Sequence, residues 1–126
     1  DSVASRGLGD VYKRQAYLFA SCPGVSKVGS YTGTGTVTQT INCGFGASGA
    51  RYVLIKRTDA AGDWYVWDSA RGFTSSSSPY LTLNTTNSET TGNNGCYAAS
   101  TGFTLTTNAS ATANINGASY IFLAVA

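Results

Sequence analysis

The sequence predicts an all-β protein, an antiparallel β-sandwich of the jelly-roll type. Short runs of β-branched and aromatic residues alternate with segments rich in Gly, Thr, Ser and Asn, which favour turns. No window combines a helical period with capping residues. The chain of 126 residues is long enough for one domain with its own core. About seven to nine short strands joined by small-residue turns are typical of sandwiches and jelly rolls.

The predicted strands are distributed over the whole chain after its first residues. Each is bounded by Gly, Pro, Ser or Asn, and several alternate apolar and polar residues with a period of two. Two polar loops are expected, the serine-rich segment 72–79, predicted to be flexible, and the segment 85–95. The strands are expected at residues 16–20, 25–31, 37–43, 53–57, 64–68, 80–84, 102–107 and 120–126.

The segment from Arg51 to Gly72 is predicted to form a β-hairpin at the centre of a sheet. If Thr58 lies opposite Asp63, then Leu54 lies opposite Trp67. Both faces of this hairpin are largely apolar, which favours a position covered on two sides. The predicted register gives one face with Val53, Ile55, Trp64 and Val66, and another with Tyr52, Leu54, Tyr65 and Trp67.

The N-terminal residues are not expected to belong to the domain. Residues 5–15, which read Ser-Arg-Gly-Leu-Gly-Asp-Val-Tyr-Lys-Arg-Gln, resemble the conceptual translation of a sequencing-library adapter. We therefore interpret residues 1–15 as a non-native, disordered leader. Residues 16–20 resemble the closing strand at residues 122–126, so residues 16–23 would be the end strand of a preceding tandem copy plus a linker. The β-sandwich domain is then predicted at residues 24–126.

Composition excludes several classes of function. Charged residues make up 11% of the chain and the net charge is +2, so the basic face of a nucleic-acid-binding protein is missing. No apolar run approaches the roughly 20 residues of a membrane-spanning helix. No pattern indicates a cofactor. We expect neither nucleic acid nor membrane among the partners.

The three cysteines, Cys22, Cys43 and Cys96, are odd in number and show no C-x-x-C spacing. We expect reduced thiols. A disulfide between Cys43 and either Cys22 or Cys96 stays open, because the spacing favours neither pairing.

Catalysis is not expected. The chain has no His, the usual general base, and its serines lack a nucleophile-elbow pattern. Glycoside hydrolysis needs two carboxyl groups, but Asp59 and Asp63 lie at a turn where Asp is favoured for backbone reasons. These two acids are also too few for a calcium site. We therefore expect no enzyme, no metal and no cofactor.

Asp68 and Arg71 form the most distinctive polar pair. In a structural interpretation, Arg71 bridges Asp68 or Glu89 and fixes the loop after the hairpin. In a binding interpretation, Arg71 is presented to an anionic sugar. The structural interpretation is favoured.

Trp64 and Trp67 are the candidate ligand contacts, because aromatic side chains can stack on sugars. Aromatic residues that alternate along a strand are more often part of a core. If the protein binds a ligand, exposed residues of the loops 75–79 and 87–94 are the other candidates, since binding concentrates on loops held by a rigid scaffold.

An ordered set of motifs resembles a domain that is common in tail-fibre and other virion structural proteins of tailed bacteriophages. The resemblance covers most of residues 25–126 and implies no catalytic residues. The family occurs in tandem copies. The motifs are Val53–Arg57, Trp64–Gly72 with its ending Asp-Ser-Ala-Arg-Gly, Leu83–Glu89, Gly102–Thr104 and Tyr120–Ala124.

The resemblance implies a structural domain of a phage virion, assembled in the host cytoplasm. Its expected partners are neighbouring copies or chains of the same fibre, in a homotrimer, and glycans of the host surface. The alternative from another class is a carbohydrate-binding module of a secreted bacterial protein. A third hypothesis is a glycan-cleaving enzyme. Its candidate acids are Asp59, Asp63, Asp68 and Glu89, and substitution of Asp63 and Asp68 would test it.

Overall fold

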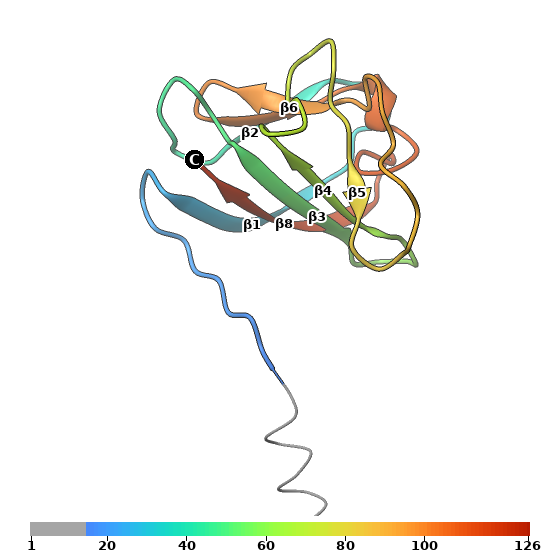
Figure 1. Ribbon diagram of the computed structural model, residues 1–126, viewed down its shortest axis with the longest axis horizontal. Helices are drawn as coiled ribbons and strands as arrows, with labels where there is room; N and C mark the ends of the chain where they lie inside the picture. The colour runs from blue at the N-terminus through green and yellow to red at the C-terminus, as the bar shows by residue number, and fades with distance from the viewer. Residues whose placement is uncertain (1–14) are drawn as a thin grey trace, which may run out of the picture.

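The computed structural model describes residues 15–126 and contains two antiparallel sheets packed face to face (Figure 1). The larger sheet has the order β1-β8-β3-β4-β5 and the smaller has the order β2-β7-β6. The predicted antiparallel β-sandwich is confirmed. The elements are β1 (Ser26–Thr32), β2 (Gln39–Asn42), β3 (Tyr52–Arg57), β4 (Trp64–Asp68), β5 (Leu81–Thr82), β6 (Cys96–Ala99), β7 (Gly102–Leu105), the short 3₁₀ helix η1 (Thr107–Ala109) and β8 (Ser119–Val125).

The pairing of strands is nested, as in a jelly roll. The first strand pairs with the last, β1 with β8, in the larger sheet. The second pairs with the second last, β2 with β7, in the smaller sheet. The middle of the chain departs from this pattern, because β3, β4 and β5 continue side by side in the larger sheet. As a result β3 lies at the centre of five strands, as predicted for the hairpin.

The core lies between the two sheets. Val53 and Ile55 from β3 are fully buried there, and so is Phe103 from β7. The rings of Phe103 and Phe122 meet edge to face with centroids 5.3 Å apart, which joins the two layers. Burial of large aliphatic and aromatic side chains of this kind stabilises a domain by about 1.5–3 kcal/mol for each residue.

The register of the β3–β4 hairpin differs by one residue from the prediction. Val53, not Leu54, lies opposite Trp67. A shift of one residue moves every side chain of a strand to the other face, so Tyr65 and Trp67 share the inner face with Val53. Trp64 and Val66 lie on the outer face instead. This register is favoured because it buries the large ring of Trp67 in the core.

The predicted strand at residues 16–20 is wrong, because this segment has no strand partner in the structure. Its side chains Tyr17, Leu18 and Phe19 are largely exposed. Strand β6 was not predicted, since its sequence Cys-Tyr-Ala-Ala has little β-propensity, and pairing with β7 imposes its conformation. The predicted leader at residues 1–15 lies outside the described residues except for Gln15.

Buried polar groups fix the connection between η1 and β8. The side chain of Asn114 is fully buried. Its Oδ1 accepts hydrogen bonds from the backbone N–H of Thr34 at 2.9 Å and from Gln39 Nε2 at 2.7 Å, and its Nδ2 donates to the Gly35 carbonyl at 3.1 Å. This network ties the connection to the β1–β2 turn, and a satisfied buried network of this kind rigidifies the structure.

Two tyrosines hold the same connection from the sheet side. The Tyr120 hydroxyl accepts a hydrogen bond from the Ile115 N–H at 3.1 Å and donates to the Thr112 carbonyl at 3.0 Å. The Tyr31 hydroxyl donates to the Ala113 carbonyl at 2.6 Å, and its ring stacks on that of Tyr120. The segment 112–115 is therefore held in place from two directions.

Candidate functional site

The outer face of the larger sheet is the most extensive candidate surface. Side chains of a strand alternate between its two faces, and here both sets are apolar. Ile121 is 44% exposed and Trp64 is 38% exposed. Besides these two, the strands and the residue after β5 place on this face Val28, Tyr52, Leu54, Val66, Leu81, Leu83 and Leu123.

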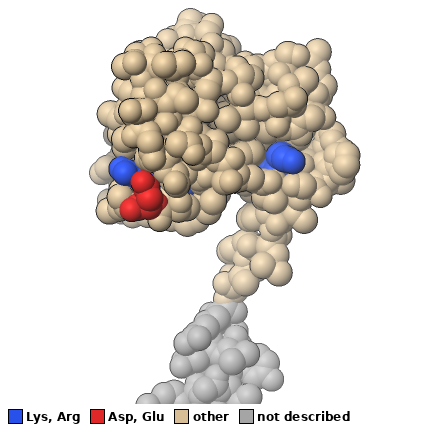
Figure 2. Space-filling model, turned by 180° about the vertical axis from the view of Figure 1, so that it is seen from behind, with Lys and Arg blue, Asp and Glu red and all other residues tan. Residues whose placement is uncertain are grey.

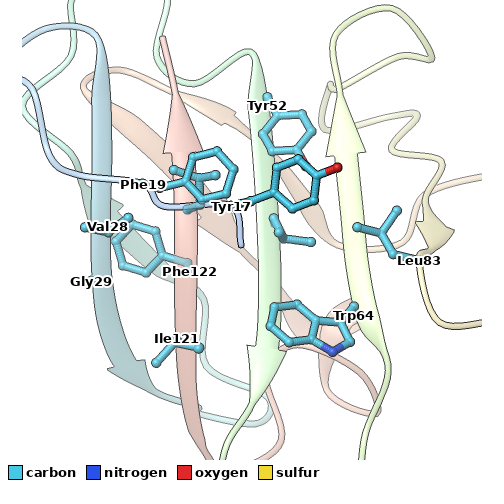
Figure 3. A pocket seen from close by; sticks show the side chains of 11 residues that line it. Tyr17, Phe19, Val28, Gly29, Tyr52, Trp64, Leu83, Ile121 and Phe122 are labelled. Carbon is cyan, nitrogen blue, oxygen red and sulfur yellow. The ribbon is translucent and has the colours of Figure 1, made fainter. Parts of the chain in front are cut away.

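A groove of about 750 Å³ lies on this face, between the sheet and the segment that precedes β1 (Figure 3). Val28, Leu54 and Ile121 form part of its floor, and Tyr17 and Phe19 flank it on the other side. Both aromatic side chains remain mostly exposed, so they shield the face only in part. The groove offers apolar contact and few polar groups, which suits packing rather than chemistry.

Hydrogen bonds direct the segment before β1 across the outer face. The Ser26 hydroxyl donates to the Ala20 carbonyl at 2.8 Å. The Val28 N–H donates to the Ser21 hydroxyl at 3.1 Å. A turn between them contains Gly24 at a φ of 74°, a backbone conformation that glycine adopts without a steric cost. The chain therefore reverses direction at this turn, and the segment that contains Phe19 runs back beside β1.

Charge is sparse on this face. Lys56 and Asp68 point outward at opposite ends of the hairpin. The ammonium of Lys56 donates to the Gly62 carbonyl at 2.8 Å, and Asp68 pairs with Arg71. Figure 2 shows one side of the molecule, on which charged groups are few and scattered.

The structure brings Asp68, Arg71 and Glu89 together. The Arg71 guanidinium forms an ion pair with the Asp68 carboxylate. The backbone N–H of Arg71 also donates a hydrogen bond to Asp68 Oδ1 at 3.0 Å. On its other side, Arg71 Nε lies 3.7 Å from Glu89 Oε2. These contacts join the end of β4 to the loop that follows β5. Arg71 therefore has the structural role of holding these two segments together.

The two tryptophans lie on opposite faces. Trp67 is fully buried in the core, with its ring centroid 5.5 Å from that of Tyr80. It cannot contact a ligand at the surface, which corrects its place among the candidate contacts. The reason is the one-residue shift in register. Trp64 remains available, on the outer face beside the apolar groove.

The two loops proposed for ligand contact are tied to each other. Ser78 is fully buried, and its hydroxyl accepts a hydrogen bond from the Asn94 N–H at 2.8 Å. The Asn94 amide also donates to the carbonyls of Ser78 and Thr90, at 3.1 and 3.2 Å. The serine-rich loop, predicted to be flexible, is therefore fastened to its neighbour by backbone and side-chain hydrogen bonds.

A second, polar cavity of about 440 Å³ lies at the tip of the β3–β4 hairpin. Asn84 Nδ2 donates to Asp63 Oδ1 at 2.9 Å, and Asn84 Oδ1 accepts a hydrogen bond from the backbone N–H of Trp64 at 2.9 Å. Sequence analysis missed this site, because its walls come from distant loops and no motif links them. Its lining residues are Arg57, Ala61, Gly62, Asp63, Tyr65, Asn84, Ala111, Thr112 and Ile115.

Electrostatics at this cavity are set by one ion pair and one half-buried phenol. Arg57 Nε donates to Asp59 Oδ1 at 2.7 Å, and this hydrogen bond lowers the pKa of Asp59 and raises that of Arg57. Burial, and to a lesser extent the nearby charge of Asp63, raises the pKa of Tyr65. The Tyr65 hydroxyl is therefore a neutral donor at physiological pH.

The cysteines provide no cross-link in the structure. Cys22 is exposed, Cys43 and Cys96 are buried, and all three are unpaired. Burial raises the pKa of Cys43 to about 11 and also raises that of Cys96. Such thiols are protonated at neutral pH and behave as small apolar side chains.

Within residues 15–126, no group of three or more His, Cys, Asp or Glu side chains is arranged to hold a metal ion. No helix in this range has both the length and the apolar character needed to span a bilayer.

Comparison with family models identifies the domain by sequence. A model matches residues 3–126, which is nearly the whole chain. The chain belongs to the family described as a domain of unknown function, DUF7483. The match to DUF7483 includes all of residues 5–15, the segment that resembles a translated adapter. The family description names no activity or partner and gives no link to phage tail fibres. Searches of curated proteins and of solved structures found no significant match.

Proposed function

We propose that this DUF7483 domain is a structural unit of a tail-fibre-like virion protein, in which the outer face of its larger sheet packs against another copy of the domain. The observation that carries the proposal is the apolar outer face. Large exposed apolar patches mark interaction surfaces in soluble proteins. Here apolar side chains of this face come from all five strands and the residue after β5, and the most exposed are Ile121, Trp64 and Leu83, at 44%, 38% and 58%. Val66 and Leu123 on the same face are buried.

A second copy suits this face better than a partner of different chemistry. The face has almost no charge with which to select an acidic or basic partner. Its two charged residues, Lys56 and Asp68, lie at opposite ends of the hairpin. When two such faces meet in antiparallel orientation, the lysine end of one copy approaches the aspartate end of the other. Residues at the centre of the contact are then apolar on both sides, as in the core of an interface.

The wider assignment rests on the ordered motifs that resemble virion structural domains of tailed phages. On this basis we propose a location in the virion, with neighbouring copies or chains of the fibre, in a homotrimer, as partners and host glycans as the surface that the fibre contacts. The antiparallel contact through the outer face joins copies in pairs, so the homotrimer would need a further contact elsewhere on the domain. No enzymatic role is proposed. Asp63 is hydrogen-bonded to Asn84 and Asp68 is paired with Arg71, so neither serves as a free general acid in this arrangement.

Sedimentation velocity of the wild type and of Ile121→Asp tests the proposal. We expect the wild-type chain to associate reversibly and the variant to sediment as a folded monomer, because the new carboxylate would be desolvated within the contact, where its neighbour Lys56 already donates to the Gly62 carbonyl. Val37→Asp is the matched control. Val37 is also exposed, at 62%, but lies in the β1–β2 turn outside the face. A monomeric wild type, or equal association of wild type and Ile121→Asp, would refute the proposal.

The alternative function is a carbohydrate-binding module of a secreted bacterial protein. The observation that favours it is the polar cavity beside Asp63 and Asn84. The genes next to the coding sequence separate the two functions. Tail and baseplate genes support the virion assignment, whereas a complete gene with a signal peptide supports the secreted module.

A further inference from the structure

We infer that the polar cavity at the tip of the β3–β4 hairpin binds a neutral pyranose sugar of one or two rings. This site is separate from the apolar outer face, and the inference does not depend on the proposed assembly. Its volume of about 440 Å³ falls within the range of roughly 300–1,000 Å³ typical of small-molecule sites.

Polar groups of the cavity match the hydroxyl groups of a sugar. Asp63 uses Oδ1 to accept from Asn84, which leaves Oδ2 as an acceptor for a sugar hydroxyl. The Asn84 amide has a second N–H, which can donate to the same sugar. A carboxylate and an amide held side by side thus offer an acceptor and a donor at fixed positions. A hydrogen bond to a charged group is stronger than one between neutral groups.

The remaining walls suit the C–H face of a sugar ring. Ala111 and Ile115 contribute apolar surface, and Tyr65 contributes an aromatic ring. The Tyr65 hydroxyl forms no hydrogen bond with any other described residue, so it is free to bond a ligand. The cavity therefore combines an apolar patch with convergent polar groups, as ligand sites do.

Charge favours a neutral sugar over an acidic one. Arg57 is the one cation among the lining residues, and its guanidinium is already paired with Asp59. The carboxylate of Asp63 would repel an acidic sugar. An uncharged hexose or N-acetylhexosamine meets neither obstacle.

The cavity is preorganised on both sides. Asn84 is fixed by its bond from the Trp64 N–H. The opposite wall is fixed by the bonds of Tyr120 to Thr112 and Ile115. Polar groups held in this way lose little freedom on binding, which improves affinity.

The test is an NMR titration of the full chain, labelled with ¹⁵N, with the methyl glycosides of glucose, galactose, mannose and N-acetylglucosamine. We expect at least one sugar to shift the amides of Gly62, Asp63, Asn84 and Ala111 in a saturable manner by about 50 mM, as for a millimolar site. Absence of saturable shifts with all four sugars, or shifts confined to other residues, would refute the inference.

Variants assign the binding to this site. Asp63→Asn keeps the shape of the side chain and should still fold, and we expect it to weaken binding about tenfold or more through the lost charged hydrogen bond. Asn84→Ala should weaken binding similarly, whereas Asn42→Ala, which changes an exposed asparagine at the end of β2 outside the cavity, should leave it unchanged. Unaltered binding by Asp63→Asn and Asn84→Ala would refute the site.

The two proposals can fail independently. Ile121→Asp should bind the sugar as the wild type does, because Ile121 does not line this cavity. Asp63→Asn should associate as the wild type does. A wild-type chain that binds a sugar at the cavity but does not associate refutes the assembly alone, and one that associates but binds no sugar refutes the sugar site alone.

Discussion

The two faces of the larger sheet are built from the same residue types but have different surroundings. Ile55 and Ile121 lie on adjacent strands, and Ile55 is fully buried whereas Ile121 is 44% exposed. Trp67 and Trp64 lie on one strand, and their exposed fractions are 0% and 38%. An apolar pattern thus marks both a core and an exposed surface. The two faces differ because the strand register decides which side chains lie on each, and because the smaller sheet covers only one of them.

Among substitutions that compare the two faces, the largest loss of stability is expected where a charge is introduced into the core. Ile55→Asp places a carboxylate among Val53, Trp67 and the smaller sheet, without a partner. We expect a loss of several kcal/mol, enough to unfold a domain of ordinary stability. Circular dichroism and urea unfolding measure the loss.

Ile121→Asp is the matched variant on the outer face. It should remain folded and lose about 1 kcal/mol or less, as surface changes usually do. A cooperatively folded Ile55→Asp protein, or an unfolded Ile121→Asp protein, would mean that the faces are assigned the wrong way round.

Substitution of the two tryptophans should give a smaller difference in stability, again with the larger loss on the core face. Trp67→Ala removes a ring packed between Tyr65 and Tyr80 and should cost about 3–5 kcal/mol. Trp64→Ala should cost much less, since part of its ring is already in water. Chemical denaturation of the two variants gives both values, and equal losses would contradict the observed register.

Alkaline pH is expected to have the smallest effect, and a thiol of the core contributes to it. Burial raises the pKa of Cys43 from 9.0 to about 11, so between these values the unfolded chain has released a proton that the folded chain retains. Stability is therefore unaffected below pH 9 and falls as pH rises from 9 towards 11. Urea unfolding of wild type and Cys43→Ala over this range measures the effect. The decline should be shallower in the variant, and an identical decline would contradict the burial of this thiol.

The fold class and the central hairpin could be predicted from the sequence because alternation and turn residues act locally. The sequence also suggests that Arg71 bridges Asp68 or Glu89, and in the structure Arg71 contacts both. The register was missed by one residue, since both faces are apolar and alternation cannot decide between them. This error misplaced Trp67.

Other features depend on contacts between distant parts of the chain. Strand β6 exists because β7 lies beside it. The apolar segment 16–20 was predicted as a strand, but nothing in the described chain pairs with it. The cavity joins Asp63 to Asn84 and to residues 111–115, which no local pattern connects. Hydrogen bonds between a side chain and a distant loop, such as those of Asn114, likewise could not be predicted from the sequence.

The most direct test of the central claim is the dependence of urea unfolding on protein concentration. If the outer face binds a second copy, the folded state is stabilised by mass action. The wild-type midpoint should then rise from micromolar to millimolar protein, and so should that of Val37→Asp, whereas the midpoint of Ile121→Asp should stay constant. A wild-type midpoint that does not change over this range would contradict the account.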